Sequence, residues 1–145
     1  MTKTKGFTLI ELMIAIVIVG ILASIAIPSY RQHMENASIA DAQSSLLGLA
    51  SAMERHRAQN GSYLGAATDG DDDNIGAPDI YHKHSPESGT AFFDLTISAA
   101  TANSFTLTAT ATANSAVWDG NKNAPTLTLT STGRKKGTGT LENAW

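Results

Sequence analysis

A single run of apolar residues near the start of the chain limits what this protein can fold into. From Phe7 to Ile27 the sequence reads FTLIELMIAIVIVGILASIAI, and Glu11 is the one ionisable residue in it. As an α-helix these residues extend about 32 Å, which matches the roughly 30 Å hydrocarbon core of a bilayer. The run therefore predicts a membrane-spanning helix rather than an element of a soluble core.

The residues that precede this run indicate how it is inserted. The segment MTKTKG carries two lysines and has no apolar region of its own, as is typical of the cytoplasmic flank of a spanning helix. A secretory signal peptide would need a short apolar region followed by a small-residue cleavage site, and none follows. We expect the apolar segment to stay with the mature protein.

Glu11 requires an explanation of its own. A charge at the bilayer centre costs about 2.5 to 3.5 kcal/mol on insertion scales, although Glu11 lies only one turn inside the run. No basic residue in the run can neutralise it, but a cut between Gly6 and Phe7 would create a cationic α-amine at a similar depth. Glu11 is then either an incidental polar residue at a helix end or the partner of that amine, within one chain or between neighbours.

Composition describes the rest of the chain as one small domain. The protein has 145 residues, 42% of them hydrophobic, and a net charge of -3. It has no cysteine, which excludes a disulfide, a thiolate nucleophile and a sulfur-ligated metal. The slight acidity argues against broad nucleic-acid binding.

An amphipathic helix is predicted to continue the membrane span over residues 30–59. Gly61, after Asn60, is a typical residue beyond a helix C-terminus. Gly20 and Pro28 weaken the helix upstream, so the stretch between them is expected to be bent or locally unwound, or else simply kinked at the membrane exit. The predicted apolar stripe recurs at spacings of three and four and comprises Ile39, Ala42, Leu46, Leu49 and Met53.

Residues 60–90 show no sustained period and predict a long loop. Within it Asp69, Asp71 and Asp73 have the spacing that begins a calcium loop. The rest of the pattern fails, because Asn74 replaces the usual Gly and Ile80 stands where a bidentate Glu belongs, so these are weak metal candidates.

Two histidines follow in the same predicted loop. His82 and His84 lie in YHKHS, and two histidines without a third ligand give little support for a metal site. They indicate instead a surface strand or the edge of a loop.

Residues 91–145 predict a small antiparallel sheet. Three segments alternate apolar residues with threonine: FFDLTIS, SFTLTATATA and PTLTLTST. Turn-forming stretches separate them, so a meander with its apolar face against the helix stripe is the simplest arrangement. The predicted fold class is therefore α+β. The expected inward residues are Phe93, Leu95, Ile97, Phe105, Leu107, Ala109, Ala111, Leu127 and Leu129.

No motif for catalysis or for a cofactor occurs in the sequence. Nucleophile elbows, zinc-protease helices, phosphate-binding loops and paired carboxylates are all missing, which argues against an enzyme. The basic residues Arg134, Lys135 and Lys136 could contact DNA, but three charges give a small electrostatic gain and fit a solvated turn better.

Residues 5–30, KGFTLIELMIAIVIVGILASIAIPSY, resemble the N-terminus of a type IV prepilin. The resemblance implies a leader at 1–6 cut after Gly6 by a prepilin peptidase, N-methylation of Phe7, and a transmembrane and polymerisation helix at 7–29. It also implies that Glu11 pairs with the Phe7 amine of a neighbouring subunit, that Gly20 and Pro28 permit unwinding in filaments, and that residues 30–145 form a pilin head.

The expected role is that of a structural subunit of a type IV pilus. The helix end and the short head are most similar to minor pilins, while a major pilin, a type II secretion pseudopilin and a DNA-binding uptake pilin remain alternatives. Expected partners are other pilin subunits, the peptidase, the inner-membrane assembly machinery and the membrane before assembly. The precursor would lie in the bacterial inner membrane with a periplasmic head and then enter an extracellular filament associated with adhesion or twitching motility.

The C-terminal region departs from the resemblance. Many members close it with a disulfide, and Ala124 and Ala144 are expected to occupy the cysteine positions here. We expect Leu141 and Trp145 to hold the tail by packing onto the head.

Overall fold

The structure is a computed structural model that describes residues 6–67, 74–118, 120 and 123–145. The chain forms two compact units, an N-terminal unit of Met1–Met34 and a head of Glu35–Trp145. One helix, α1 (Leu9–Asn60), contributes to both units. The candidate metal ligands Asp69, Asp71 and Asp73 lie outside the described residues.

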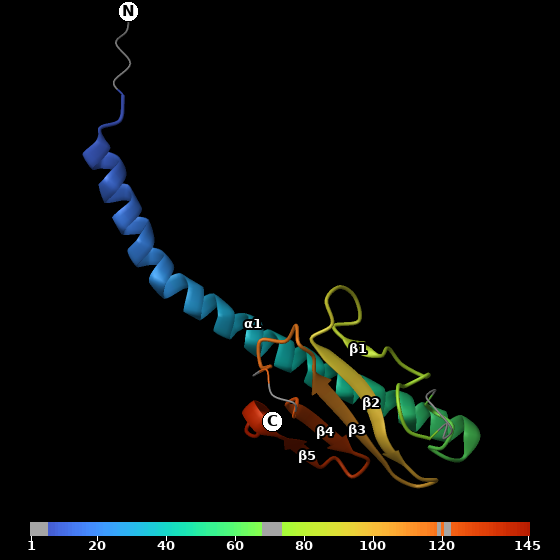
Figure 1. The fold of residues 1–145 in the computed structure, drawn as a ribbon. Coiled ribbons are helices and arrows are strands. Elements are labelled where there is room, and N and C mark those ends of the chain that lie inside the picture. Colours follow the sequence, from blue (N-terminus) through green and yellow to red (C-terminus); the bar gives the residue numbers. More distant parts are fainter. Residues whose placement is uncertain (1–5, 68–73, 119, 121–122) are drawn as a thin grey trace, which may run out of the picture. The chain divides into compact units, whose positions relative to one another are not determined.

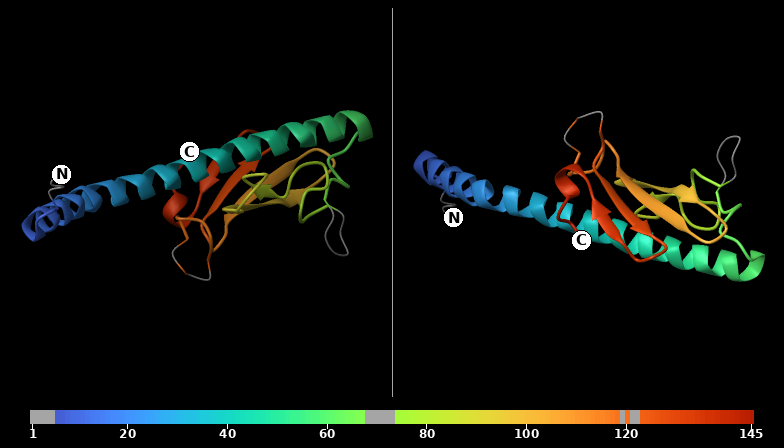
Figure 2. Two further views of the ribbon diagram at one scale, coloured as in Figure 1. Left: turned by 90° about the horizontal axis from the view of Figure 1, so that it is seen from above. Right: turned by 90° about the horizontal axis from the view of Figure 1, so that it is seen from below.

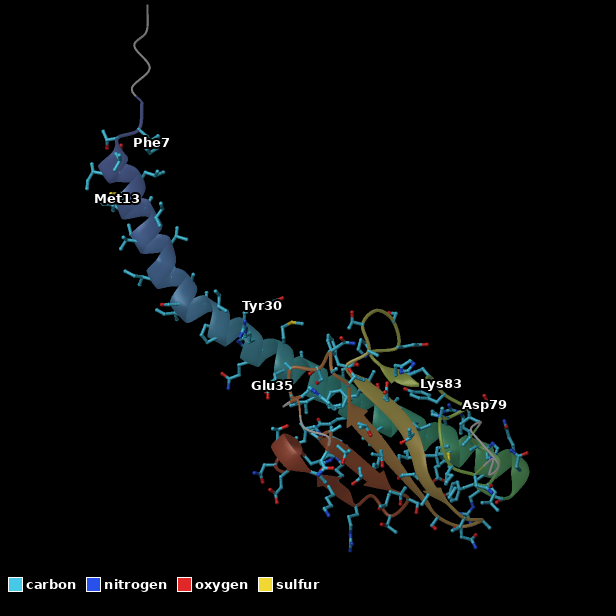
Figure 3. The ribbon with its side chains drawn as sticks, in the orientation of Figure 1. Phe7, Met13, Tyr30, Glu35, Asp79 and Lys83 are labelled. Carbon is cyan, nitrogen blue, oxygen red and sulfur yellow. The ribbon has the colours of Figure 1, made fainter. Side chains whose placement is uncertain are left out.

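The N-terminal unit is a helix without a core of its own. From Gly6 to Met34 every residue is exposed except Ala23, which is half-buried. Figure 3 shows the side chains from Phe7 to Tyr30 projecting outward around this helix. By length and composition the helix can cross a membrane.

Of the expectations for the stretch between Gly20 and Pro28, local unwinding is wrong for this structure, because α1 is helical throughout and Pro28 lies inside it. A proline removes only one backbone hydrogen bond. The helix-forming apolar residues on both sides maintain the remaining ones. Unwinding of this stretch in filaments stays a prediction.

In the head, one face of α1 is buried as the spacing predicts. Ala42, Leu46, Leu49 and Met53 have no exposed surface, and Ile39 is half-buried. The helix ends where the sequence indicates, because Gly61 has a positive φ of 75° and its N–H donates to the Arg57 carbonyl at 2.7 Å.

The sheet has five strands in the order β1-β2-β3-β4-β5, and every neighbouring pair is antiparallel. Figures 1 and 2 show it against one side of the second half of α1. Strands β2, β3 and β4 are the three predicted ones, whereas β1 and β5 are too short to show an alternating pattern. The strand bounds are β1 (His84–Ser85), β2 (Phe93–Ala100), β3 (Phe105–Ala111), β4 (Thr126–Thr130) and β5 (Lys135–Gly137).

The core lies between the sheet and the buried helix face. All nine predicted inward residues of β2, β3 and β4 are buried. Fully burying a large apolar side chain stabilises a fold by about 1.5 to 3 kcal/mol, so this layer dominates the stability of the head. The segment predicted as a loop also contributes, because Tyr63, Ala66 and Ala67 are buried in the same cluster.

The tail is closed by noncovalent contacts, as expected from Leu141 and Trp145. Leu141 ends the 3₁₀ helix η1 (Gly139–Leu141) and is fully buried. The indole N–H of Trp145 donates to the Lys136 carbonyl at 3.1 Å, and the side-chain amide of Gln43 on α1 donates to the Ala144 carbonyl. That Ala124 and Ala144 replace cysteines stays a prediction.

Candidate functional site

The start of α1 holds the residues that the sequence singles out for processing and assembly. Gly6 and Phe7 precede the helix, which begins at Leu9, so the Gly6–Phe7 peptide bond lies outside the helical hydrogen-bond ladder. Gly6, Phe7, Thr8 and Glu11 line a hollow of about 280 Å³. Phe7 as a whole residue is 87% exposed.

Glu11 has a partner that the charge argument overlooked. Its Oε2 accepts hydrogen bonds from the Thr8 N–H at 3.3 Å and from the Thr8 hydroxyl at 3.2 Å. In return the Glu11 N–H donates to Thr8 Oγ1 at 3.3 Å. This reciprocal pattern is a capping box, which satisfies two N–H groups that a helix start leaves unpaired.

A sequence signal for this contact was available, because Thr8 and Glu11 stand three residues apart immediately before an apolar helix. The carboxylate can accept several hydrogen bonds, and Thr8 occupies only one of its oxygens. Glu11 therefore keeps accepting capacity for a further cation while it caps the helix.

Gly20 and Pro28 lie far from that start, within the exposed helix. A Cβ built on Gly20 would contact nothing within 4 Å, so packing inside the chain does not require glycine there. The Ser24 hydroxyl donates to the Ile21 carbonyl at 2.7 Å, one turn before Pro28. Serine bonds of this kind accompany bending of apolar helices.

The two histidines of the predicted loop lie against different acids. His84 is in β1, a surface strand as expected, and its Nδ1 lies 2.9 Å from Asp94 on β2. His82 stacks on Tyr81 and lies 3.9 Å from Glu87. Within the described ranges no three His, Cys, Asp or Glu side chains are placed to hold a metal ion.

One ionisable group in this region is perturbed. Burial raises the pKa of Tyr81, and the nearby carboxylates of Glu87 and Asp41 raise it further, while Arg55 partly opposes them. The ring leans on α1 at Gly48, where a Cβ would overlap the phenol oxygen. Tyr81 is thus a packing residue whose phenol stays neutral near pH 7.

The basic residues near the C-terminus do not form one patch. Lys135 pairs with the buried Leu129, and Lys136 pairs with Thr128 on the opposite face of the sheet. The Lys135 ammonium lies 4.7 Å from the centroid of the Trp145 ring, a cation–π contact that braces the tail. Lys135 and Lys136 form one basic group in the sequence, but alternation along β5 places their side chains on opposite faces of the sheet.

Comparison with known proteins adds evidence on the family of the chain, which the geometry alone does not supply. Residues 1–27 match the model of the prokaryotic N-terminal methylation motif. Residues 28–128 match the model described as type IV minor pilin ComP, DNA uptake sequence receptor.

Curated relatives match mainly over shorter stretches. A fimbrial protein of Moraxella nonliquefaciens is 48% identical over 61 residues, which are 42% of this chain and 39% of that protein. The fimbrial protein EcpB of Eikenella corrodens is 67% identical over 39 residues, 27% of this chain and 24% of that one. A type IV major pilin protein PilE1 of Neisseria gonorrhoeae is 44% identical over 62 residues, 43% of this chain and 38% of that one. The chain therefore matches less than half the length of these relatives.

Among solved structures, the Neisseria meningitidis non-core minor pilin PilV matches with a TM-score of 0.49 and 23% identity, over 74% of this chain and 89% of that one. The family model, in contrast, spans most of the chain. The chain belongs to the type IV minor pilin family whose model is that of the ComP DNA uptake sequence receptor.

Proposed function

We propose that this protein is a structural subunit of a type IV pilus, cut after Gly6, methylated on Phe7 and assembled through the first half of α1. The observation that carries the proposal is an apolar helix whose residues from Gly6 to Met34 are all exposed except half-buried Ala23. Lipid covers such a surface before assembly, and the helices of other subunits cover it afterwards. The match to the methylation motif over residues 1–27 supports the processing step.

Glu11 sets the register between subunits in this mechanism. An unpaired carboxylate in the apolar centre of a filament is penalised, and a neighbour's Phe7 amine relieves that penalty at one axial position. The Thr8 contacts hold the carboxylate at the helix start without using all of its acceptor positions. Gly20 and Pro28 are proposed to let the helix adapt during packing, because neither contributes to a packed interior of the isolated chain.

The subunit is proposed to be a minor one, because the family model over residues 28–128 is that of a minor pilin. A major subunit is the rival that the relatives with major-pilin names favour. A pseudopilin would be favoured by calcium binding at Asp69, Asp71 and Asp73, which lie outside the described residues. The role is structural rather than enzymatic.

The location follows from the same helix. The precursor is proposed to sit in the bacterial inner membrane, with Lys3 and Lys5 on the cytoplasmic side and the head in the periplasm. Its partners would be the prepilin peptidase, the assembly machinery and other pilins. The finished subunit would lie in an extracellular filament.

The test is a Glu11→Ala variant, compared with Glu142→Ala, which removes an exposed acid from the head. We expect Glu11→Ala to lower incorporation into sheared filaments at least about tenfold, since breaking a buried ion pair costs several kcal/mol. The amount in the membrane fraction should stay unchanged. Mass spectrometry of the wild-type subunit should show that Met1 to Gly6 are gone and that Phe7 carries a methyl group.

Two results would contradict the proposal. One is normal incorporation of Glu11→Ala into filaments. The other is assembled protein that retains Met1 to Gly6.

A second candidate function is DNA binding during uptake. The specific observation in its favour is the family model, which is described as a DNA uptake sequence receptor. The acidic composition and net charge of -3 argue that any such binding is local to one surface.

A further inference from the structure

The face of the sheet that points away from α1 is lined by hydroxyl side chains. Because strand residues alternate between faces, burial of the apolar set leaves the intervening residues on the outside. On β3 and β4 those residues are half-exposed threonines, and on β2 they are exposed Asp94, half-exposed Thr96 and exposed Ser98. This threonine face comprises Thr96, Ser98, Thr106, Thr108, Thr110, Thr126, Thr128 and Thr130.

The strand register arranges the threonine face in rows. Thr106 lies opposite Thr130, Thr108 opposite Thr128, and Thr110 opposite Thr126. Successive rows are about 6.8 Å apart along the strands, and members of one row about 4.8 Å apart across them. The result is a surface of hydroxyl and methyl groups.

Two cations extend these rows at the β5 edge. Lys136 pairs with Thr128 and so shares its face, and the Arg134 carbonyl accepts the Thr130 N–H at 3.0 Å. Arg134 lies immediately before β5, and its N–H donates to Thr130 Oγ1 at 3.2 Å, which places its backbone beside Thr130 at the end of these rows. The Arg134 and Lys136 side chains are both exposed, whereas Lys135 lies on the other side against Trp145.

Among the described strand residues, the acid on this face is Asp94, which lies opposite Thr110 and away from the two cations. Asp94 is on β2, three strands from β5, which is about 14 Å. That separation exceeds the Debye length of about 8 to 10 Å at physiological salt. His84 also contacts the Asp94 carboxylate at 2.9 Å.

Hydroxyl donors lie on β3, two strands from the edge that carries the cations. Thr106 and Thr110 make no side-chain hydrogen bond within the described part of the chain. The Thr128 hydroxyl donates to the Lys136 carbonyl at 3.2 Å, which ties the face to the edge strand. Arginine, lysine and threonine side chains are among the groups that contact DNA phosphates.

We infer that the threonine face with Arg134 and Lys136 is the surface that docks the phosphate backbone of duplex DNA. The inference rests on the proposed DNA-binding function and names the surface that performs it. Arg134 and Lys136 lie beyond residues 28–128, the part that the family model covers. They neutralise phosphates, and the threonine hydroxyls donate to phosphate oxygens along the same strand of DNA.

Two neutralised phosphates give a defined salt dependence. The logarithm of the affinity should fall with the logarithm of the salt concentration with a slope of about -1.8. Between 50 and 200 mM salt the affinity then drops by about 12-fold. Removing one of the two contacts should leave a drop of about 3.5-fold.

The experiment measures fluorescence anisotropy of a labelled duplex titrated with the full mature chain in detergent micelles. Lys136→Gln and Arg134→Gln are the test variants, and Lys135→Gln is the matched control, since it removes the same charge at the adjacent position on the opposite face. Thr106→Val with Thr110→Val removes the hydroxyls and keeps the shape. Circular dichroism checks that each variant folds.

The expected result is weaker binding and a salt slope reduced by about 0.9 for each of Lys136→Gln and Arg134→Gln, with Lys135→Gln close to wild type. The threonine double variant should weaken binding without changing the slope. Equal losses for Lys135→Gln and Lys136→Gln would overturn the assigned surface while leaving DNA binding intact. No binding by the wild type at low salt would overturn DNA binding itself, and the pilus-subunit proposal would still rest on the Glu11 test.

Discussion

Glu11 shows how one side chain can serve two purposes at the residue scale. The carboxylate caps α1 through Thr8, with three hydrogen bonds between the two residues. The same group is proposed to receive the Phe7 amine of a neighbouring subunit. A carboxylate that is already hydrogen-bonded loses less on entering an apolar environment than a bare one, because part of its solvation is replaced.

At this scale we predict that Thr8→Ala destabilises the first turn of α1. Loss of an N-terminal cap costs about 1 kcal/mol, which corresponds to roughly fivefold faster amide hydrogen exchange at Leu9 to Leu12 in micelles. Thr8→Ser keeps the hydroxyl and should behave like the wild type. If Thr8→Ala and Thr8→Ser exchange at the same rate, the capping box contributes nothing measurable.

At the scale of elements, the C-terminal turn folds back on the edge strand without a disulfide. Gly137 ends β5 and is buried, and a Cβ at this position would lie 1.7 Å from the Leu141 carbonyl oxygen. The neighbouring atom is backbone and has no rotamer with which to move away. Glycine is therefore required where η1 crosses β5.

We predict that Gly137→Ala lowers the free energy of unfolding of the head. Overpacking of this kind typically costs about 1 to 3 kcal/mol. Lys136→Ala alters the preceding, exposed residue and should change stability by no more than about 0.5 kcal/mol. Urea denaturation followed by tryptophan fluorescence compares the two, and equal midpoints would mean that the turn can shift freely.

On the scale of the whole molecule, the two units of the chain differ in whether their apolar side chains are buried. The head encloses its own core, while the N-terminal unit keeps almost all of its apolar side chains exposed. Membrane insertion should therefore depend on the first unit, and stability against denaturant should depend on the head.

The prediction at this scale separates the stability of the head from membrane insertion. Leu46 is 0% exposed and Leu47 is 48% exposed, so Leu46→Ala should lose about 2 to 5 kcal/mol of head stability and Leu47→Ala much less. Both variants should appear in the membrane fraction in wild-type amounts. Similar destabilisation by the two substitutions would contradict the assigned helix face.

The sequence by itself determined the features that depend on local periodicity. The apolar run, the helix stripe at Leu46, Leu49 and Met53, and the inward faces of the three long strands all follow from spacings of 3.6 or 2 residues. Glu11 could be identified from the sequence because a lone charge in an apolar run is unusual wherever it occurs. Its contact with Thr8 is just as local, but the charge argument sought a cation and not a hydroxyl.

Only the tertiary structure decided what depends on contacts between distant segments. Strands β1 and β5 are too short to carry a pattern and exist because β2 and β4 offer free edges. The register of β4 and β5 decides that Lys135 shares the face of buried Leu129 while Lys136 shares that of Thr128. Gln43 meets Ala144 across the chain. Such pairings are set by how the core packs, and no short window of sequence contains both partners.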